Sequence, residues 1–238
     1  PYAVPWIYDV IGTAESLVAS KKSGVTDLAG LVGKKVGTPF GSTAHYSLLA
    51  ALELGGVDPT KVEIVDLEPQ DILAAWERGD IDAAYVWNPT LAELTPSTVL
   101  ATSEELAGKG RLTADLAVVT TAFADQYPDV MTTWVEQQNR AVELYKTDPQ
   151  AAAEAIGRQL NLTADEVLAQ MADYIYLDAT EQAGADYLGT PDAPGALAEN
   201  LLSAAEFLKA QGQVDEVPAL SVFQAGLANS FAEKVAAK

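Results

Sequence analysis

Residues 36–54 read VGTPFGSTAHYSLLAALEL, and this stretch decides the fold. An apolar segment, 36–40, runs into Gly-Ser-Thr at 41–43, after which apolar residues recur at helical spacing. The pattern predicts a strand, a tight loop and a helix. Hydroxyl side chains can cap such a helix, and its first N–H groups have no partner inside it, so its start can attract a small anion. His45, the only histidine, lies in this first turn. An ordinary capped helix after a strand is the alternative interpretation.

Short β-rich runs alternate with helical runs through the first two thirds of the chain. This alternation predicts an α/β fold with a parallel or mixed sheet. The expected strands are 4–8, 16–20, 35–38, 62–67, 81–87, 99–101 and 116–120. The expected helices are 28–32, 45–54, 70–78, 90–94 and 103–107. Ligands of such sheets bind at the carboxyl ends of strands, where 41–45 and 87–89 are expected to lie.

The character of the sequence changes after residue 121. Four segments there are rich in Ala, Leu, Glu and Gln, and helices are predicted at 129–146, 149–160, 164–172 and 196–210. Thr163 and Glu166 have the spacing of a capping box. The change of pattern indicates two lobes of one protein, since no internal repeat and no disordered linker separates them.

Composition excludes several classes of protein. The chain has 238 residues, no cysteine and a formal charge of −20, from 34 acidic and 14 basic residues. Without cysteine there is no disulfide, iron–sulfur cluster or thiolate nucleophile. The negative charge disfavours nucleic acid and anionic membranes as partners. No apolar run approaches the roughly 20 residues that a membrane-spanning helix needs.

Two carboxylates stand just before apolar strand-like runs. Glu15 lies in GTAES and Asp115 in LTADL, at places where the chain can cross between lobes. Two carboxylates that converge on a pocket can hold an ammonium group or act as a general acid and base. Solvated turn acids are the alternative. Trp87, at a strand end, can cover a cation or an alkyl chain, whereas Trp76 is expected in the core.

Signals for catalysis are weak. The motifs GxSxG, GxGxxG, GxxxxGK[ST] and HExxH are absent, and one histidine cannot form a histidine-rich metal site. We therefore expect no metal, no cofactor and no catalytic residue. A lone histidine at a helix start more often binds an anion or donates a hydrogen bond than acts as a base.

Three blocks of the sequence together resemble a known family. They are STAHYSLLAAL, VEIVDLEPQDILAAWERGDIDAAYVWNP and LTADLAVVTTAFADQYPDV, and EFLKAQGQV at 206–214 adds a fourth similarity. The chain resembles the taurine-binding periplasmic components of ABC importers, within the wider group of aliphatic-sulfonate and nitrate binding proteins. The resemblance covers almost the whole chain, and it is specific because the blocks occur together and in order.

The resemblance implies a two-lobed α/β clamshell of the type II periplasmic binding proteins. Residues 21–110 are then lobe II, and 1–20 with 111–238 are the remainder of lobe I with the hinge strands. Family members usually have a further stretch before the equivalent of Pro1, with the first strands of lobe I and a Ser-rich loop. Lobe I is therefore expected to be incomplete here.

The resemblance also implies taurine, 2-aminoethanesulfonate, as the ligand. The sulfonate would be bound by Ser42, Thr43, His45 and main-chain N–H groups at the helix start, with Tyr46 as a further donor or a packing residue. No net positive charge is needed for this, because oriented donors suffice.

The ammonium group would be accepted by Asp115 and Glu15, with Trp87 over the alkyl stem. An alkanesulfonate without an amine would leave these carboxylates without a partner. A quaternary ammonium has no N–H to donate and would need an aromatic cage instead.

Several alternatives stay open from the sequence. The ligand can be another small sulfonate or an amino-phosphonate. The protein can also be a sensor that kept the fold, or an enzyme like the thiamine-pyrimidine synthases, although these use a cysteine-rich motif. The expected partners are an ABC permease with its ATPase, and the expected state is a monomer. The expected location is periplasmic or extracytoplasmic, with or without a lipid anchor.

Overall fold

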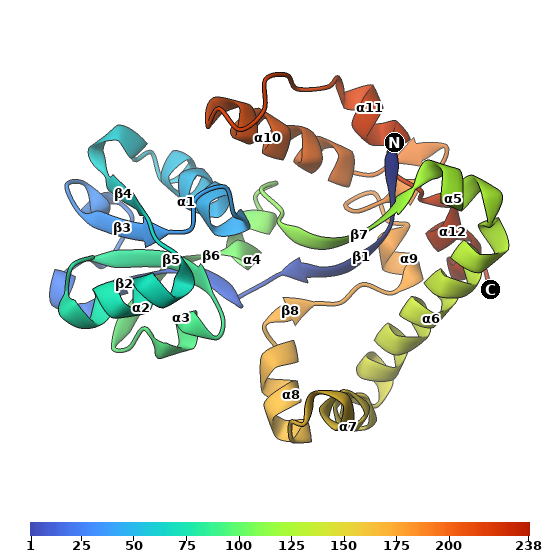
Figure 1. The fold of residues 1–238 in the computed structure, drawn as a ribbon, viewed down its shortest axis with the longest axis horizontal. Coiled ribbons are helices and arrows are strands. Elements are labelled where there is room, and N and C mark those ends of the chain that lie inside the picture. Colours follow the sequence, from blue (N-terminus) through green and yellow to red (C-terminus); the bar gives the residue numbers. More distant parts are fainter. The chain divides into compact units, whose positions relative to one another are not determined.

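The structure, a computed structural model, describes residues 1–238 and confirms the predicted α/β class (Figure 1). The chain forms two compact units. The first unit consists of Pro1–Val10, Ala114–Lys209 and Val214–Lys238, and the second of Ile11–Thr113 and Ala210–Gln213. The chain therefore passes between the units near residues 10, 113, 209 and 213.

The second unit is built on a mixed five-stranded sheet in the order β4-β3-β5-β2-β6. Its strands are β2 (Glu15–Ser20), β3 (Lys35–Thr38), β4 (Glu63–Asp66), β5 (Ala83–Trp87) and β6 (Ser97–Thr102). Strand β3 runs parallel to β4 and β5, whereas β2 is antiparallel to β5 and β6. We assigned β2 to lobe I from sequence, but its pairing places it inside the second unit, because both of its neighbours belong to that sheet.

Helices lie on both faces of this sheet, so it encloses two hydrophobic cores (Figure 1). On β5, Ala83 and Tyr85 point into the core formed with α1 (Thr43–Leu54). The alternate residues Ala84 and Val86 point into the core formed with α2 (Pro69–Arg78). This explains why β5 is a continuous apolar run, since a strand buried on both faces needs no polar residue.

The shorter elements of this unit fill the ends of the sheet. They are the 3-10 turns Lys21–Ser23, Ala29–Leu31 and Pro59–Lys61, and the helices α3 (Thr90–Glu93) and α4 (Ser103–Ala107). The predicted helix at 28–32 is thus a single 3-10 turn. Helix α4 begins with a capping box between Thr102 and Glu105, which fixes its start directly after β6.

The first unit contains a three-stranded sheet in the order β7-β1-β8. The strands are β1 (Tyr2–Ile11), β7 (Ala114–Thr120) and β8 (Tyr174–Ile175), with a small hairpin of β9 (Gly189–Thr190) and β10 (Ala193–Pro194). Its helices are α5 (Thr121–Gln126), α6 (Pro128–Thr147), α7 (Pro149–Leu160), α8 (Ala164–Met171), α9 (Ala179–Gln182), α10 (Leu197–Ala210), α11 (Leu220–Ala225) and α12 (Ser230–Ala236). The long helices α6, α7, α8 and α10 lie where the sequence predicts them, and the short helices α5, α9, α11 and α12 were not predicted.

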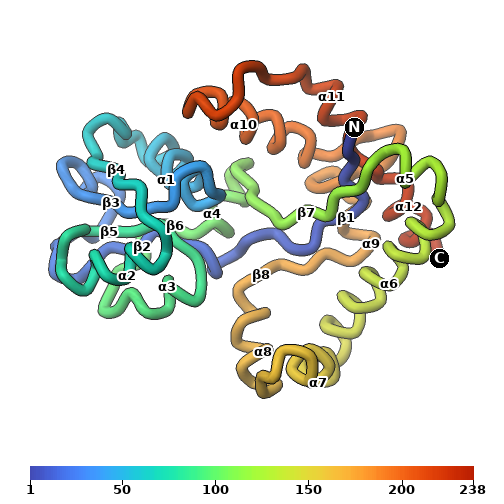
Figure 2. Tube along the Cα trace, in the orientation of Figure 1, coloured from blue at the N-terminus to red at the C-terminus, as the bar shows by residue number.

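Both ends of the chain contribute to the first unit, as the colours of Figure 2 show. Trp6 of β1 shares a hydrophobic core with Phe231 and Val235 of α12. The main chain of Val4 also exchanges hydrogen bonds with Gly226 and Ala228, at 2.8 and 2.9 Å. The C-terminal helices therefore hold β1 in place.

A buried glutamine links β1 to α9. The side chain of Gln182 is fully buried; its Oε1 accepts from the N–H of Ile7 and its Nε2 donates to the carbonyl of Ile7, both at 2.9 Å. The side-chain amide thus satisfies both main-chain hydrogen-bonding groups of Ile7, as a neighbouring strand would. No helix in the described chain combines the length and the apolar character that crossing a bilayer requires.

Candidate functional site

The start of α1 lies at the carboxyl end of β3, as the sequence predicts. Ser42 has an extended backbone and caps the helix: its Oγ accepts from the N–H of His45 at 3.2 Å and donates to the carbonyl of Pro39 at 2.6 Å. The N–H groups of Thr43 and Ala44 have no acceptor within the helix, as in the first turn of any helix. These two groups and the helix dipole can bind an anion.

The loop before α1 depends on glycine. Gly41 has φ +76°, and a Cβ atom there would lie 2.6 Å from Nε2 of Gln213. A side chain at this position is therefore strained by the backbone conformation, and the flexible end of Gln213 would have to move away from it. The N–H of Phe40 donates to Oδ1 of Asp66 at 2.9 Å, which ties the loop to the end of β4.

His45 is buried, with 3% of its surface exposed. Its Nδ1 accepts from the N–H of Gly41 at 3.3 Å, and its ring stacks on Phe40 with centroids 4.3 Å apart. Burial lowers the pKa of His45, while the negative charge of Asp66 opposes this. A neutral ring whose Nδ1 accepts carries its proton on Nε2, so His45 can act as a neutral hydrogen-bond donor.

Glu15 is the centre of a buried hydroxyl network. Only 1% of its surface is exposed, so it is not a solvated turn acid. Its Oε2 accepts from Thr43 at 2.6 Å, and its Oε1 accepts from Ser103 at 2.9 Å and from Ser47 at 3.4 Å. The Tyr85 hydroxyl lies 3.1 Å from Oγ of Ser103. Hydrogen bonds to the charged form compensate for the burial of a carboxylate.

This network changes the role expected for Thr43. Its hydroxyl proton is directed to Glu15, so in this structure the hydroxyl does not donate to a sulfonate as we expected. Only the main-chain N–H of Thr43 remains for an anion. The side chain instead links the start of α1 to β2, which holds the first helical turn in position.

Trp87 lies beside Glu15. The two residues are paired across β5 and β2, and Trp87 is half-buried against both cores of the second unit. Tyr46 is buried, with 8% of its surface exposed, and Trp76 lies in the core as predicted. Glu15, Trp87 and the start of α1 thus form one cluster at one end of the sheet.

Asp115 belongs to the first unit. It is exposed on β7 and stands opposite Asp9 of β1 in the antiparallel register. Burial and the charge of Asp115 raise the pKa of Asp9 to about 7. The other six residues expected at the site, Glu15, Ser42, Thr43, His45, Tyr46 and Trp87, lie in the second unit.

Sequence reasoning missed Ser47, Ser103 and Asp9. Ser47 could have been found, because it stands four residues after Thr43 and so shares its helix face. No local signal identifies Ser103, which reaches Glu15 from 88 residues away. Asp9 lies inside the mostly apolar run of β1, and strand alternation alone does not identify it as a candidate site residue.

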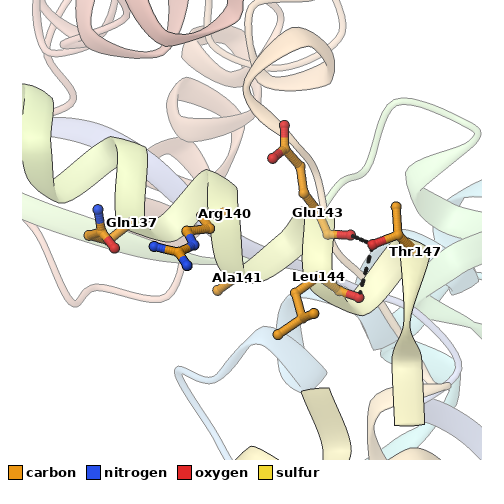
Figure 3. A pocket seen from close by; sticks show the side chains of 6 residues that line it. All are labelled: Gln137, Arg140, Ala141, Glu143, Leu144 and Thr147. Atoms are coloured by element: carbon orange, nitrogen blue, oxygen red, sulfur yellow. Dashed lines mark hydrogen bonds between the residues drawn. The ribbon is translucent and has the colours of Figure 1, made fainter. Parts of the chain in front are cut away.

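The structure contains hollows besides this cluster. One of about 700 Å³ is lined by residues of α6 alone, namely Gln137, Arg140, Ala141, Glu143, Leu144 and Thr147 (Figure 3). The Thr147 hydroxyl bonds back to the carbonyls of Glu143 and Leu144. Because all lining side chains come from one helix, polar groups do not converge there from several sides. No group of three or more His, Cys, Asp or Glu side chains has the arrangement of a metal site.

Comparison with known sequences identifies relatives over most of the chain. A family model described as NMT1/THI5 like matches residues 3–152. The chain is 35% identical over 224 residues to the taurine-binding periplasmic protein of Escherichia coli strain K12. The aligned part is 91% of this chain and 67% of that protein.

Solved structures with the same fold include binding proteins and an enzyme. The periplasmic aliphatic sulphonate binding protein SsuA from Escherichia coli superposes with a TM-score of 0.69 at 18% identity, covering 93% of this chain and 72% of SsuA. The desulfurization enzyme DSZB gives 0.64 at 17% identity, covering 98% of this chain and 78% of DSZB. At these identities the likeness concerns the fold alone.

Proposed function

The chain belongs to the NMT1/THI5-like family, and on that premise we propose that it is the substrate-binding component of an ABC importer whose ligand is taurine. The observation that carries the proposal is its 35% identity, over 91% of the chain, to a taurine-binding periplasmic protein. The chemistry of the cluster around α1 and Glu15 is compatible with a small zwitterion. An ABC permease with its ATPase is the partner, and the location is periplasmic or extracytoplasmic.

The start of α1 binds the sulfonate group of the ligand in this proposal. Main-chain N–H groups of Thr43 and Ala44 and the helix dipole stabilise an anion without any lysine or arginine. His45 adds a neutral donor, because burial lowers its pKa and its Nδ1 accepts from Gly41. Ser42 holds the turn in place, since both of its hydrogen-bonding directions are used within the loop.

Carboxylates bind the ammonium group of the ligand in this proposal. Asp115 is exposed and not committed to an ion pair. Glu15 lies beside Trp87, which can cover the alkyl stem, but its oxygens already accept three hydroxyls. We therefore assign the direct contact with the ammonium to Asp115 and a supporting negative charge to Glu15.

Isothermal titration calorimetry with three sulfonates tests this function. Taurine should bind in the micromolar range or tighter, whereas isethionate, with a hydroxyl in place of the amine, and ethanesulfonate should bind at least tenfold more weakly. The physical reason is that both analogues lack the charge-assisted hydrogen bond between the ammonium and Asp115, and a hydrogen bond to a charged group contributes about 1.5–3 kcal/mol. Equal affinity for all three would show a general sulfonate site, and tighter binding of an aminoalkyl phosphonate would reassign the ligand.

An aspartate substitution tests the ammonium contact. Asp115→Ala should weaken taurine binding by more than tenfold, because a charge-assisted hydrogen bond is lost. Asp125→Ala is the matched control, since Asp125 is an exposed acid of the same unit on α5. An effect below twofold for Asp115→Ala would remove this residue from the site.

An enzyme is the second candidate, because the desulfurization enzyme DSZB shares the fold. Any such activity would have to work without a cysteine nucleophile, since the chain has no cysteine. Incubation of the protein with taurine and with aromatic sulfinates, followed by assay of released sulfite, separates the two functions. Sulfite release above the buffer rate would favour the enzyme over the importer component.

A further inference from the structure

The first unit contains a cavity that the proposed taurine site does not use. It has a volume of about 290 Å³ and lies among β1, α6, α7, α8 and the segment after β8. Its lining residues are Trp6, Tyr8, Asp9, Gln138, Ala141, Val142, Tyr145, Ala152, Ile156, Met171 and Tyr176. The volume is at the lower end of ligand pockets, so it suits a ligand of only a few heavy atoms.

Asp9 is the only charged side chain in this lining. Its Oδ1 is buried and receives no hydrogen bond from the protein. A buried carboxylate oxygen without a donor is costly and rare in native structures. The absence of any Lys or Arg in the wall means that the protein itself supplies no cation for it.

The strand is irregular where Asp9 enters the cavity. The register between β1 and β7 shifts between Ile7 and Asp9, so strict alternation of side chains is interrupted there. Such bulges re-aim a side chain and are frequent beside functional sites. As a result Trp6, Tyr8 and Asp9 all line one cavity.

Four of the other ten lining residues are aromatic, namely Trp6, Tyr8, Tyr145 and Tyr176. The rings of Tyr145 and Tyr176 meet edge to face with centroids 5.2 Å apart, and Trp6 is buried, with 1% of its surface exposed. Ring faces attract a cation and pack against an alkyl chain. A carboxylate among rings is therefore suited to an organic ammonium ion and unsuited to an anion such as a sulfonate.

We propose that this cavity binds a small primary alkylammonium ion, with its N–H donors on Asp9 and its stem against Tyr145, Tyr176 and Trp6. A primary amine fits better than a quaternary one, because Oδ1 needs a hydrogen-bond donor. The inference is independent of the taurine proposal, since the cavity lies wholly within the first unit and excludes the start of α1.

Binding should depend on pH through Asp9. The titratable groups around it are Tyr8 on the same strand, Asp115 on β7, Tyr145 on α6, and Tyr176 and Tyr174 beside or within β8. Because the pKa of Asp9 is about 7, its ionised fraction and the affinity should rise about tenfold from pH 6 to 8.

The test is calorimetry with n-butylammonium chloride at pH 8, without taurine. Butylammonium should bind, and butan-1-ol, its neutral analogue, should bind at least tenfold more weakly. Asp9→Asn keeps the shape of the side chain and should weaken butylammonium binding more than tenfold, since a charge-assisted hydrogen bond is lost. The control Asp125→Asn changes an exposed acid of the same unit and should leave the affinity unchanged.

A measurement on the unchanged protein keeps the proposal testable even if the Asp9→Asn variant does not fold. The carbon-13 shift of the Asp9 carboxyl should titrate near pH 7, and butylammonium should move its midpoint downward by stabilising the ionised form. An unmoved midpoint would overturn the proposal. So would equal binding of butan-1-ol, which would indicate a merely apolar cavity, or competition by taurine, which would indicate one shared site.

Discussion

Asp9 gives the stability of this protein a defined dependence on pH. Its pKa rises from 3.8 to about 7 on folding, mainly because burial disfavours the charged form and also because Asp115 stands opposite. The stabilisation that a raised pKa gives is fully present at pH values below the pKa of the unfolded state. It is lost as the pH rises through the pKa of the folded state. The free energy of unfolding should therefore fall between about pH 4 and pH 8 through this one group.

The magnitude follows from the two pKa values. The difference between 3.8 and about 7 corresponds to about 4 kcal/mol over the whole range, of which about 2.5 kcal/mol falls between pH 5 and pH 8. Asp9 is partly exposed, so solvent screening reduces the expected value to about 1–2 kcal/mol. Asp9→Asn cannot ionise and should lack this part of the pH dependence.

Urea unfolding of the parent protein and Asp9→Asn at pH 5, 6, 7 and 8 measures the effect. The difference between the two proteins isolates Asp9, since His45 and the surface acids are common to both. Asn should be the more stable residue at pH 8, and its advantage should shrink toward pH 5. Parallel stability curves from pH 5 to pH 8 would refute the reasoning, and Asp125→Asn should give such parallel curves in any case.

Two further predictions concern the second unit. Ser103→Ala removes the 2.9 Å hydrogen bond to buried Glu15 and should lower the free energy of unfolding by about 1.5–3 kcal/mol. The control Ser221→Ala changes an exposed serine and should alter the free energy of unfolding by less than about 0.5 kcal/mol. Equal effects of the two substitutions in urea unfolding would contradict the hydrogen-bond network around Glu15. Gly41→Ala and Gly33→Ala should each cost about 1–2 kcal/mol, because both glycines have a positive φ, +76° and +75°, and the flexible end of Gln213 can move away from a Cβ at position 41; thermal melts in which neither variant is destabilised would contradict this reasoning.

Much of the fold could be predicted from local sequence. Strand β3 and helix α7 lie at their predicted residues, and α1 begins two residues earlier than predicted, directly after its cap, Ser42. Short helices such as α9 and α12 escaped prediction. A helix of four to seven residues has too few apolar repeats for a periodic pattern, and packing in the tertiary structure stabilises it instead.

The candidate site divides in the same way. The capped start of α1 and the place of Trp87 at a strand end follow from residue types and spacing. The environment of Glu15 does not, because its donors come from α1 and α4, which are separated from it by 28 to 88 residues. Sequence alone could therefore name Glu15 but could not show that hydroxyl groups already surround it.

The sequence by itself determined the α/β class, the helix start with its anion-binding N–H groups, and the absence of thiol chemistry. These features depend on neighbouring residues and on composition. Only the tertiary structure decided that β2 joins the sheet of the second unit, that Thr43 serves Glu15, and that Asp9 enters an aromatic cavity. The physical reason is that burial, strand pairing and pKa depend on groups brought together from distant parts of the chain. Local sequence patterns do not specify which of these distant groups will be in contact.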